Sequence, residues 1–136
     1  GWKYSQPSNA VYETNNHVIT EAFSNISVKT DLSDVVFVLS YDGECRVECY
    51  EEESAKHLVE VKDDTLVIRQ NYRSWHDYIK IYTKTPKITV YLPKPEYGAL
   101  SVIGKTGDVE IPKDFRFESA DISLSTGTAV FSAAGL

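Results

Sequence analysis

The residues of this 136-residue chain that best combine chemistry with spacing lie in one short segment, residues 71–82. Aromatic side chains recur there at every third position, with a guanidinium and an imidazole between them. Flat rings of this kind stack on sugars, and Tyr, Trp and Arg are enriched at protein–protein hot spots. The alternative is that the rings fold back and cover the end of the core. The candidate contacts for a glycan or a surface protein are Tyr72, Arg73, Trp75, His76 and Tyr78, with Trp75 the first choice.

The two cysteines, Cys45 and Cys49, are four positions apart on one expected strand. At about 3.3 Å per residue their Cα atoms lie about 13 Å apart. A disulfide needs Cα atoms within about 7 Å, so a straight strand excludes the pair. A zinc site would need a second pair of ligands, which this spacing does not supply. We interpret both as buried thiols that act as small apolar side chains, with Val47 between them.

The remaining polar residues predict no catalytic, metal or cofactor site. His17, His57 and His76 fall in polar or loop-like segments, and we interpret them as surface side chains. The glycine patterns of nucleotide sites and of serine hydrolases do not occur. The aspartates near turns lack the glycine-rich repeat of calcium-binding coils. The acidic run at 51–53 is typical of a solvated loop. We therefore predict that the protein is not an enzyme.

Strands must position these residues, because apolar and polar residues alternate along most of the chain. The alternation is clear at Ile26–Thr30, at Cys45–Cys49 and at Ile88–Leu92, and it predicts strands with one buried face. The continuous apolar run Val35–Leu39 predicts a strand covered on both faces. Short polar turns separate the strands, and no long helical pattern lies between them. The chain is therefore predicted to be all-β.

A sequence echo near the C-terminus indicates how the strands are arranged. A strand followed by Thr-Gly at 106–107 is repeated twenty residues later, with Thr-Gly at 126–127. A weaker copy starts at Ile26 and leads to Asp34. Twenty residues is about one coil of a stacked β-structure, with coils about 4.8 Å apart. We predict a β-solenoid, a β-helix-like roll of short strands, with a two-sheet β-sandwich as the alternative.

Charge and length restrict the partners and the domain organisation. The net charge of -6 argues against nucleic acid as the main partner. No run of eighteen apolar residues occurs, so a membrane contact would need an N-terminal anchor that is absent from this chain. Because the chain contains no Met, we expect such a segment, or a signal peptide, ahead of Gly1. We expect an extended linker over 1–16 and a β-strand-repeat domain over 17–136 that is truncated at its C-terminus.

Several of these segments, in the same order, resemble a known family. The chain is similar to the bacterial putative adhesins, a family of unknown function built from β-strand repeats and frequent in Firmicutes. It departs from the family at Thr128, where Asp is usual. The resemblance implies an ectodomain held to the envelope by an N-terminal segment, and it supplies no catalytic residues. The segments are Phe23–Val35, Cys45–Glu53, Asp64–Ile68, Pro86–Pro93, Thr106–Ile111 and Ser125–Gly127.

We therefore expect a non-enzymatic, extracytoplasmic domain at the bacterial cell surface with an adhesin-like binding or structural role. One alternative is the ectodomain of an envelope-stress sensor or regulatory protein. The other is a solenoid that binds or acts on polysaccharide. Because open strand edges pair with other strands, we also expect a weak homodimer through the C-terminal coil.

Overall fold

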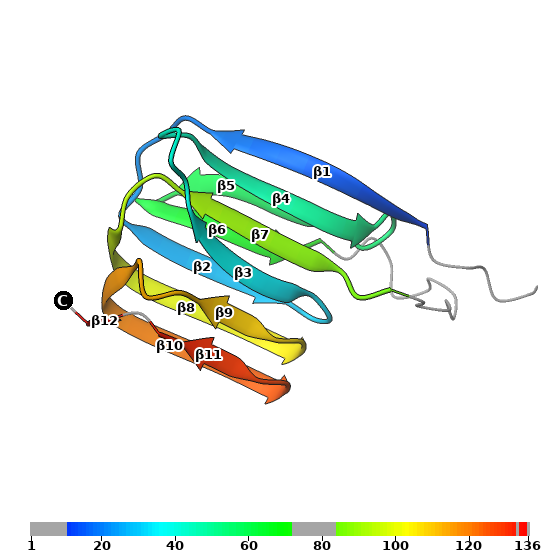
Figure 1. Ribbon diagram of the computed structural model, residues 1–136. Helices are drawn as coiled ribbons and strands as arrows, with labels where there is room; N and C mark the ends of the chain where they lie inside the picture. Colours follow the sequence, from blue (N-terminus) through cyan, green and yellow to red (C-terminus); the bar gives the residue numbers. More distant parts are fainter. Residues whose placement is uncertain (1–10, 72–83, 133, 136) are drawn as a thin grey trace, which may run out of the picture.

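The computed structural model describes residues 11–71, 84–132, 134 and 135, and the regular elements of this part are all β-strands (Figure 1). The first strand spans both sides of the boundary expected between residues 16 and 17. The strands are β1 (Tyr12–Ile19), β2 (Asn25–Thr30), β3 (Asp34–Leu39), β4 (Cys45–Glu52), β5 (His57–Lys62), β6 (Thr65–Gln70), β7 (Lys87–Leu92), β8 (Glu96–Thr106), β9 (Val109–Ile111), β10 (Arg116–Thr126), β11 (Ala129–Phe131) and β12 (Ala134–Gly135).

The strands form two mixed sheets that pack face to face (Figure 1). The first sheet has the order β1-β4-β7-β3-β9-β11, and the second has the order β12-β10-β8-β2-β6-β5. The prediction of an all-β fold is confirmed. The two packed sheets correspond to the sandwich alternative, and the solenoid prediction does not describe the domain as a whole. The reason is that β1, β4 and β5 pair antiparallel with their neighbours, so the chain reverses there instead of advancing coil by coil.

The C-terminal end of the domain does stack parallel coils. Thr126 of β10 pairs with Thr106 of β8, which is the twenty-residue offset of the sequence echo. The weaker copy is also in register, because Val35 of β3 pairs with Val109 of β9. In space, therefore, β2 and β3 form the coil next to β8 and β9, although residues 40–95 lie between the two coils in the chain.

The tight corners between these coils explain the repeated Thr-Gly pairs. Gly107 and Gly127 have φ angles of +148° and +130°, a region that favours glycine. A Cβ atom on Gly127 would lie 1.9 Å from the carbonyl oxygen of Gly107. A Cβ atom on Gly107 would lie 2.5 Å from the carbonyl oxygen of Ser33. Glycine is thus required because the backbones of successive coils meet there.

The core lies between the sheets and takes alternate residues from both of them. The expectation that Val35–Leu39 is covered on both faces is wrong. Val35 and Phe37 are buried, whereas Val36 and Val38 on the opposite face are only half-buried, since no third layer covers that face in the described part of the chain. The same part holds no helix long and apolar enough to cross a membrane. The largest buried apolar side chains are Phe37, Phe115, Phe117, Ile26, Leu66, Ile68, Ile88, Leu92, Leu100 and Ile111.

Candidate functional site

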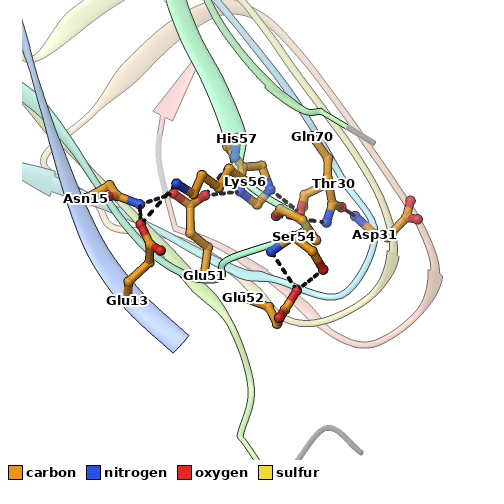
Figure 2. Close-up of polar contacts among 11 residues, drawn as sticks. Glu13, Asn15, Thr30, Asp31, Glu51, Glu52, Ser54, Lys56, His57 and Gln70 are labelled. Carbon is orange, nitrogen blue, oxygen red and sulfur yellow. Dashed lines mark hydrogen bonds and ion pairs between the residues drawn. The ribbon is translucent and has the colours of Figure 1, made fainter. Parts of the chain in front are cut away.

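Where the edge strands β1 and β5 close the sandwich, its interior becomes polar. The half-buried residues of β1 alternate with exposed ones and include Glu13, Asn15 and His17. They face β4, whose inward positions end with Cys49 and Glu51. Polar side chains in a low-dielectric interior are stable only when they are paired with one another. The pairing here is shown in Figure 2.

Glu51, His57 and Thr30 form a continuous chain of hydrogen bonds across the two sheets (Figure 2). The Nδ1 atom of His57 lies 2.9 Å from Oε1 of Glu51, and the backbone N–H of His57 donates to the same oxygen at 2.7 Å. A carboxylate only accepts, so Nδ1 carries the proton. The Nε2 atom of His57 lies 2.8 Å from the hydroxyl of Thr30. We call these three residues the brace, because they tie β2, β4 and β5 together.

Asn15 extends the polar network from the brace towards β1 (Figure 2). Its amide nitrogen donates to Oε2 of Glu51 at 2.7 Å and to Oε2 of Glu13 at 2.8 Å. The ammonium of Lys56 lies 3.4 Å from the same Glu13 oxygen. Every acidic group of this interior therefore has a donor.

The hydrogen bonds determine the ionisation of Glu51. Burial by itself would raise the pKa of this carboxyl group. The hydrogen bonds from His57 and Asn15, together with the charge of His57, outweigh that effect and place the pKa below its ordinary value of 4.5. Glu51 is therefore an ionised carboxylate at neutral pH.

Two expectations from the sequence are wrong at this site. His57 was expected at the surface and the acidic run 51–53 in a solvated loop, but His57 is 5% exposed, Glu51 1% and Glu52 2%, whereas Glu53 is exposed in the turn as expected. The reason is that β4 continues through Glu52, whose carboxylate accepts the backbone N–H of Ser54 and closes the turn to β5. A signal was present in the sequence, because Glu51 continues the inward alternation of Cys45, Val47 and Cys49. Both cysteines are buried free thiols, as predicted.

The order carboxylate, imidazole, hydroxyl in the brace is that of a hydrolytic triad. The nucleophile of a triad must meet its substrate, however, and here Thr30 is only 6% exposed, with its side chain on the inward face of β2. The side chains of His57 and Glu51 are each 1% exposed. The geometry therefore holds strands together and does not present a nucleophile.

Next to the brace, a groove of about 350 Å³ lies over β2, β6 and the end of β8. Gln70 in its wall connects the groove to the turn before β5, since its side-chain oxygen accepts the N–H of Asp31 at 2.9 Å and its amide donates to the carbonyl of Ala55 at 3.3 Å. Thr30 belongs to both the groove and the brace. The lining residues are Lys29, Thr30, Asp31, Arg69, Gln70, Ile103, Gly104 and Lys105.

The groove is basic although the chain as a whole is acidic. It contains three cationic side chains, Lys29, Arg69 and Lys105, and one carboxylate, Asp31. Lys29 and Arg69 are exposed and directly opposite one another in the register of β2 and β6. Like charges in this position are unfavourable without a compensating partner. Among the described residues neither of them has an acidic partner, whereas Lys105 lies 3.9 Å from Asp31. The arrangement is chemically suited to an anion.

A second depression, of about 510 Å³, follows the glycine corners of the coils. Its acidic residues, Asp34 and Asp108, already accept backbone N–H groups of the neighbouring coil, at 2.8 and 2.9 Å. Their carboxylates therefore have a structural role there.

The aromatic contact residues predicted from the sequence, Tyr72, Arg73, Trp75, His76 and Tyr78, lie outside the described residues. Their segment joins β6 to β7. The prediction that they contact a ligand or partner remains a prediction. The basic groove was not predicted, although its cations occupy outward positions next to core residues such as Val28 and Ile68.

Taken together, these features define an all-β domain of two packed, mixed sheets, with parallel coils towards one end, a polar brace at the other end and a basic groove over the strands between them. No family model and no curated protein matches the chain.

Solved structures do share the fold. A putative adhesin of Bacteroides fragilis is 21% identical, with a TM-score of 0.55, and the match covers 96% of this chain and 63% of that chain. A putative cell adhesion protein of Clostridium sporogenes is 9% identical, with a TM-score of 0.56 and coverage of 86% and 59%. A putative adhesin of Parabacteroides merdae is 12% identical, with a TM-score of 0.52 and coverage of 95% and 59%.

This chain therefore spans less than two thirds of the length of each of these proteins. At such identities the likeness establishes a common fold. It extends across Bacteroides, Parabacteroides and Clostridium, so the narrower expectation of a Firmicutes type is not supported.

Proposed function

We propose that this chain is a non-enzymatic binding domain of the bacterial cell surface and that its basic groove holds an acidic polysaccharide. The observation that carries the proposal is the opposed pair Lys29 and Arg69, which lies in a groove and lacks an acidic partner among the described residues. Sulfate and carboxylate groups along a polymer would neutralise both cations, and a guanidinium can hold either group with two hydrogen bonds. The buried hydroxyl of Thr30 favours binding over cleavage.

The fold supports an adhesin-like role outside the cytoplasm, because the three proteins of the same fold are named as putative adhesins or as a putative cell adhesion protein. The family resemblance of the sequence supports attachment to the envelope through a segment outside this chain. A basic groove that lies over three neighbouring strands of a sheet is suited to an extended polymer, which lies along a surface.

The test is binding to immobilised polymers: a sulfated polysaccharide, a polyuronate and neutral dextran. The double variant Lys29→Glu/Arg69→Glu reverses the charge of the groove. The control, Lys87→Glu/Lys113→Glu, makes the same change in net charge at two exposed lysines on other surfaces. We expect the parent to bind the acidic polymers in a salt-dependent way, the groove variant to bind at least about tenfold more weakly, and the control to stay within about twofold of the parent.

Two outcomes contradict the proposal. In the first, the parent binds none of the acidic polymers at low salt. In the second, the control variant loses as much binding as the groove variant, which would assign the effect to net charge alone.

A further inference from the structure

Beside the brace, three side chains of the kinds that bind transition metals converge from two adjacent strands. They are His17 of β1 and Cys49 and Glu51 of β4. One donor atom from each, a ring nitrogen, the thiol sulfur and a carboxylate oxygen, lies within 4.8 Å of the other two. The sequence could not show this group, because only the antiparallel register of β1 and β4 brings His17 close to Cys49.

An independent observation at the same place concerns a buried ring nitrogen of His17. The Nε2 atom of His17 is buried and has no hydrogen-bond partner among the residues that the structure describes. A buried polar atom without a partner costs about 1–3 kcal/mol, so native structures seldom retain one without a reason. Imidazole nitrogen is the commonest metal ligand of proteins, and coordination would satisfy this atom.

Hydrogen bonds from neighbouring residues already hold the carboxylate of Glu51 in one orientation. Glu51 accepts two hydrogen bonds from His57 on Oε1 and one from Asn15 on Oε2. A carboxylate has about four acceptor positions, so one remains on Oε2. Metal-ligating carboxylates are typically oriented by such hydrogen bonds from neighbouring residues.

We propose that His17, Cys49 and Glu51 bind one divalent cation of the zinc type. A nitrogen, a sulfur and an oxygen donor suit this borderline-soft ion, and three protein ligands leave one tetrahedral position open. Donor atoms around zinc lie about 3.5 Å apart, so small side-chain rotations would close the observed spacing. The thiolate and the carboxylate would balance the charge of the ion in a buried site. Binding would release the thiol proton of Cys49.

The experiment uses Co²⁺ as a spectroscopic probe and Zn²⁺ as its competitor. A cobalt–thiolate bond gives a charge-transfer absorption in the near ultraviolet that cobalt bound through nitrogen and oxygen alone does not give. We expect chelator-treated protein to develop this band with a stoichiometry of one Co²⁺ per chain and to lose it when Zn²⁺ is added. Zn²⁺ should also raise the melting temperature of the parent, since an ion that binds only the folded state stabilises it.

Three variants make the assignment. Cys45→Ser is the matched control, because it removes the other buried thiol of the same strand, and it should keep both the band and the shift in melting temperature. Cys49→Ser should lose the band. His17→Gln, at a half-buried position, should weaken Co²⁺ binding at least about tenfold.

The proposal is overturned if folded parent protein shows no cobalt–thiolate band at millimolar Co²⁺. It is equally overturned if the band persists unchanged in His17→Gln, or if it depends on Cys45 and not on Cys49. Circular dichroism of each variant separates loss of the site from loss of the fold.

Discussion

The side-chain Oδ1 atom of Asp34 accepts a hydrogen bond from the backbone N–H of Asp108, 2.8 Å away in space and 74 residues away in sequence. Asp108 repeats the arrangement with the N–H of Thr128 at 2.9 Å, twenty residues further on. The same turn position is thus connected through three successive coils. The carboxylate at this position satisfies a backbone N–H group that faces it from the next coil, where the corner interrupts the sheet.

Removing the first of these carboxylates should loosen the stack of coils. We expect Asp34→Ala to lower the free energy of unfolding by about 1–2 kcal/mol, because one charge-assisted hydrogen bond is lost and an N–H group is left without its partner. Asp34→Asn, which keeps an oxygen acceptor, should lose less than half of that. Urea unfolding measures both, with Asp121→Ala, an exposed aspartate of β10, as the control. Equal losses in Asp34→Ala and Asp121→Ala would refute the structural role.

The corner glycines should be far less tolerant of a side chain than a glycine in an open turn. Gly127→Ala would place a Cβ atom 1.9 Å from the carbonyl of Gly107, so the two coils must separate. We expect a loss of more than about 3 kcal/mol, or insoluble protein. Gly43→Ala is the matched control, since its φ of +75° is also positive but nothing lies within 4 Å of the added atom. That variant should lose only about 1 kcal/mol.

The pKa of Glu51 predicts part of the acid sensitivity of the fold. A carboxyl group whose folded pKa lies below its ordinary value of 4.5 contributes stability above that value, and the contribution is lost as the pH falls through the folded pKa. We expect Glu51→Gln to cost about 1–3 kcal/mol near neutral pH, because its amide nitrogen would face the donating amide of Asn15 and the hydrogen bonds from His57 would no longer be to a charged group. We also expect a shallower decline of stability below about pH 4.5.

Denaturant unfolding across the acid range measures both effects in Glu51→Gln. The neighbouring Glu53→Gln, at an exposed position, is the control and should follow the parent. If the free energy of unfolding of Glu51→Gln fell as steeply with decreasing pH as that of the parent, the brace would not contribute to acid sensitivity.

The two thiols should be protected from alkylation in the folded protein. Burial raises the pKa of Cys45 to about 11 and that of Cys49 to about 12, where the carboxylates of Glu51 and Glu48 add to the effect of burial. Because the thiolate is the reactive form, alkylation near pH 8 should be at least about a hundredfold slower in native protein than in urea. Mass spectrometry over time gives both rates, and rapid labelling of native protein would contradict the burial of these side chains.

The C-terminal coil should mediate weak self-association. Among the described residues β11 pairs with β9 alone, and Val130 and Phe131 are 53% and 41% exposed. An open strand edge with apolar side chains pairs readily with another strand. We propose a concentration-dependent dimer and expect Val130→Lys to weaken it. Light scattering over a wide concentration range is the measurement, and a monomer at the highest concentration would refute the proposal.

The local structure of this chain could be predicted from its sequence because the alternation of apolar and polar residues within a strand indicates which of its faces is buried. Val28, Val47 and Val90 lie at the centres of alternating segments, and all three are fully buried. The two Thr-Gly pairs, twenty residues apart, predicted the parallel register of β8 and β10 for a similar reason. A repeated corner requires a glycine at the same place in each coil.

The pairing of distant strands could not be predicted in this way. Nothing in the local pattern around Val28 indicates that its strand lies between β6 and β8, or that β4 reverses direction beside β7. The candidate sites depend on these pairings. Lys29 faces Arg69, and His17 approaches Cys49, only after the sheets have formed. The burial of Glu51 was not predicted, because the charge of a run of three glutamates favours a solvated loop. The position of Glu51 in the alternation of β4 is what determines its burial.

The repeating register of the coils also makes the size of the domain adjustable in fixed steps. Each coil pairs in parallel with the coil before it, and its free edge presents the same pattern of backbone N–H and C=O groups to a coil that would follow. Inserting or deleting one twenty-residue unit would move that end of the molecule by one strand spacing, about 4.8 Å, and would leave Lys29, Arg69 and the brace where they are. Evolution can thus change the length of such a domain without altering its brace or the opposed pair Lys29 and Arg69.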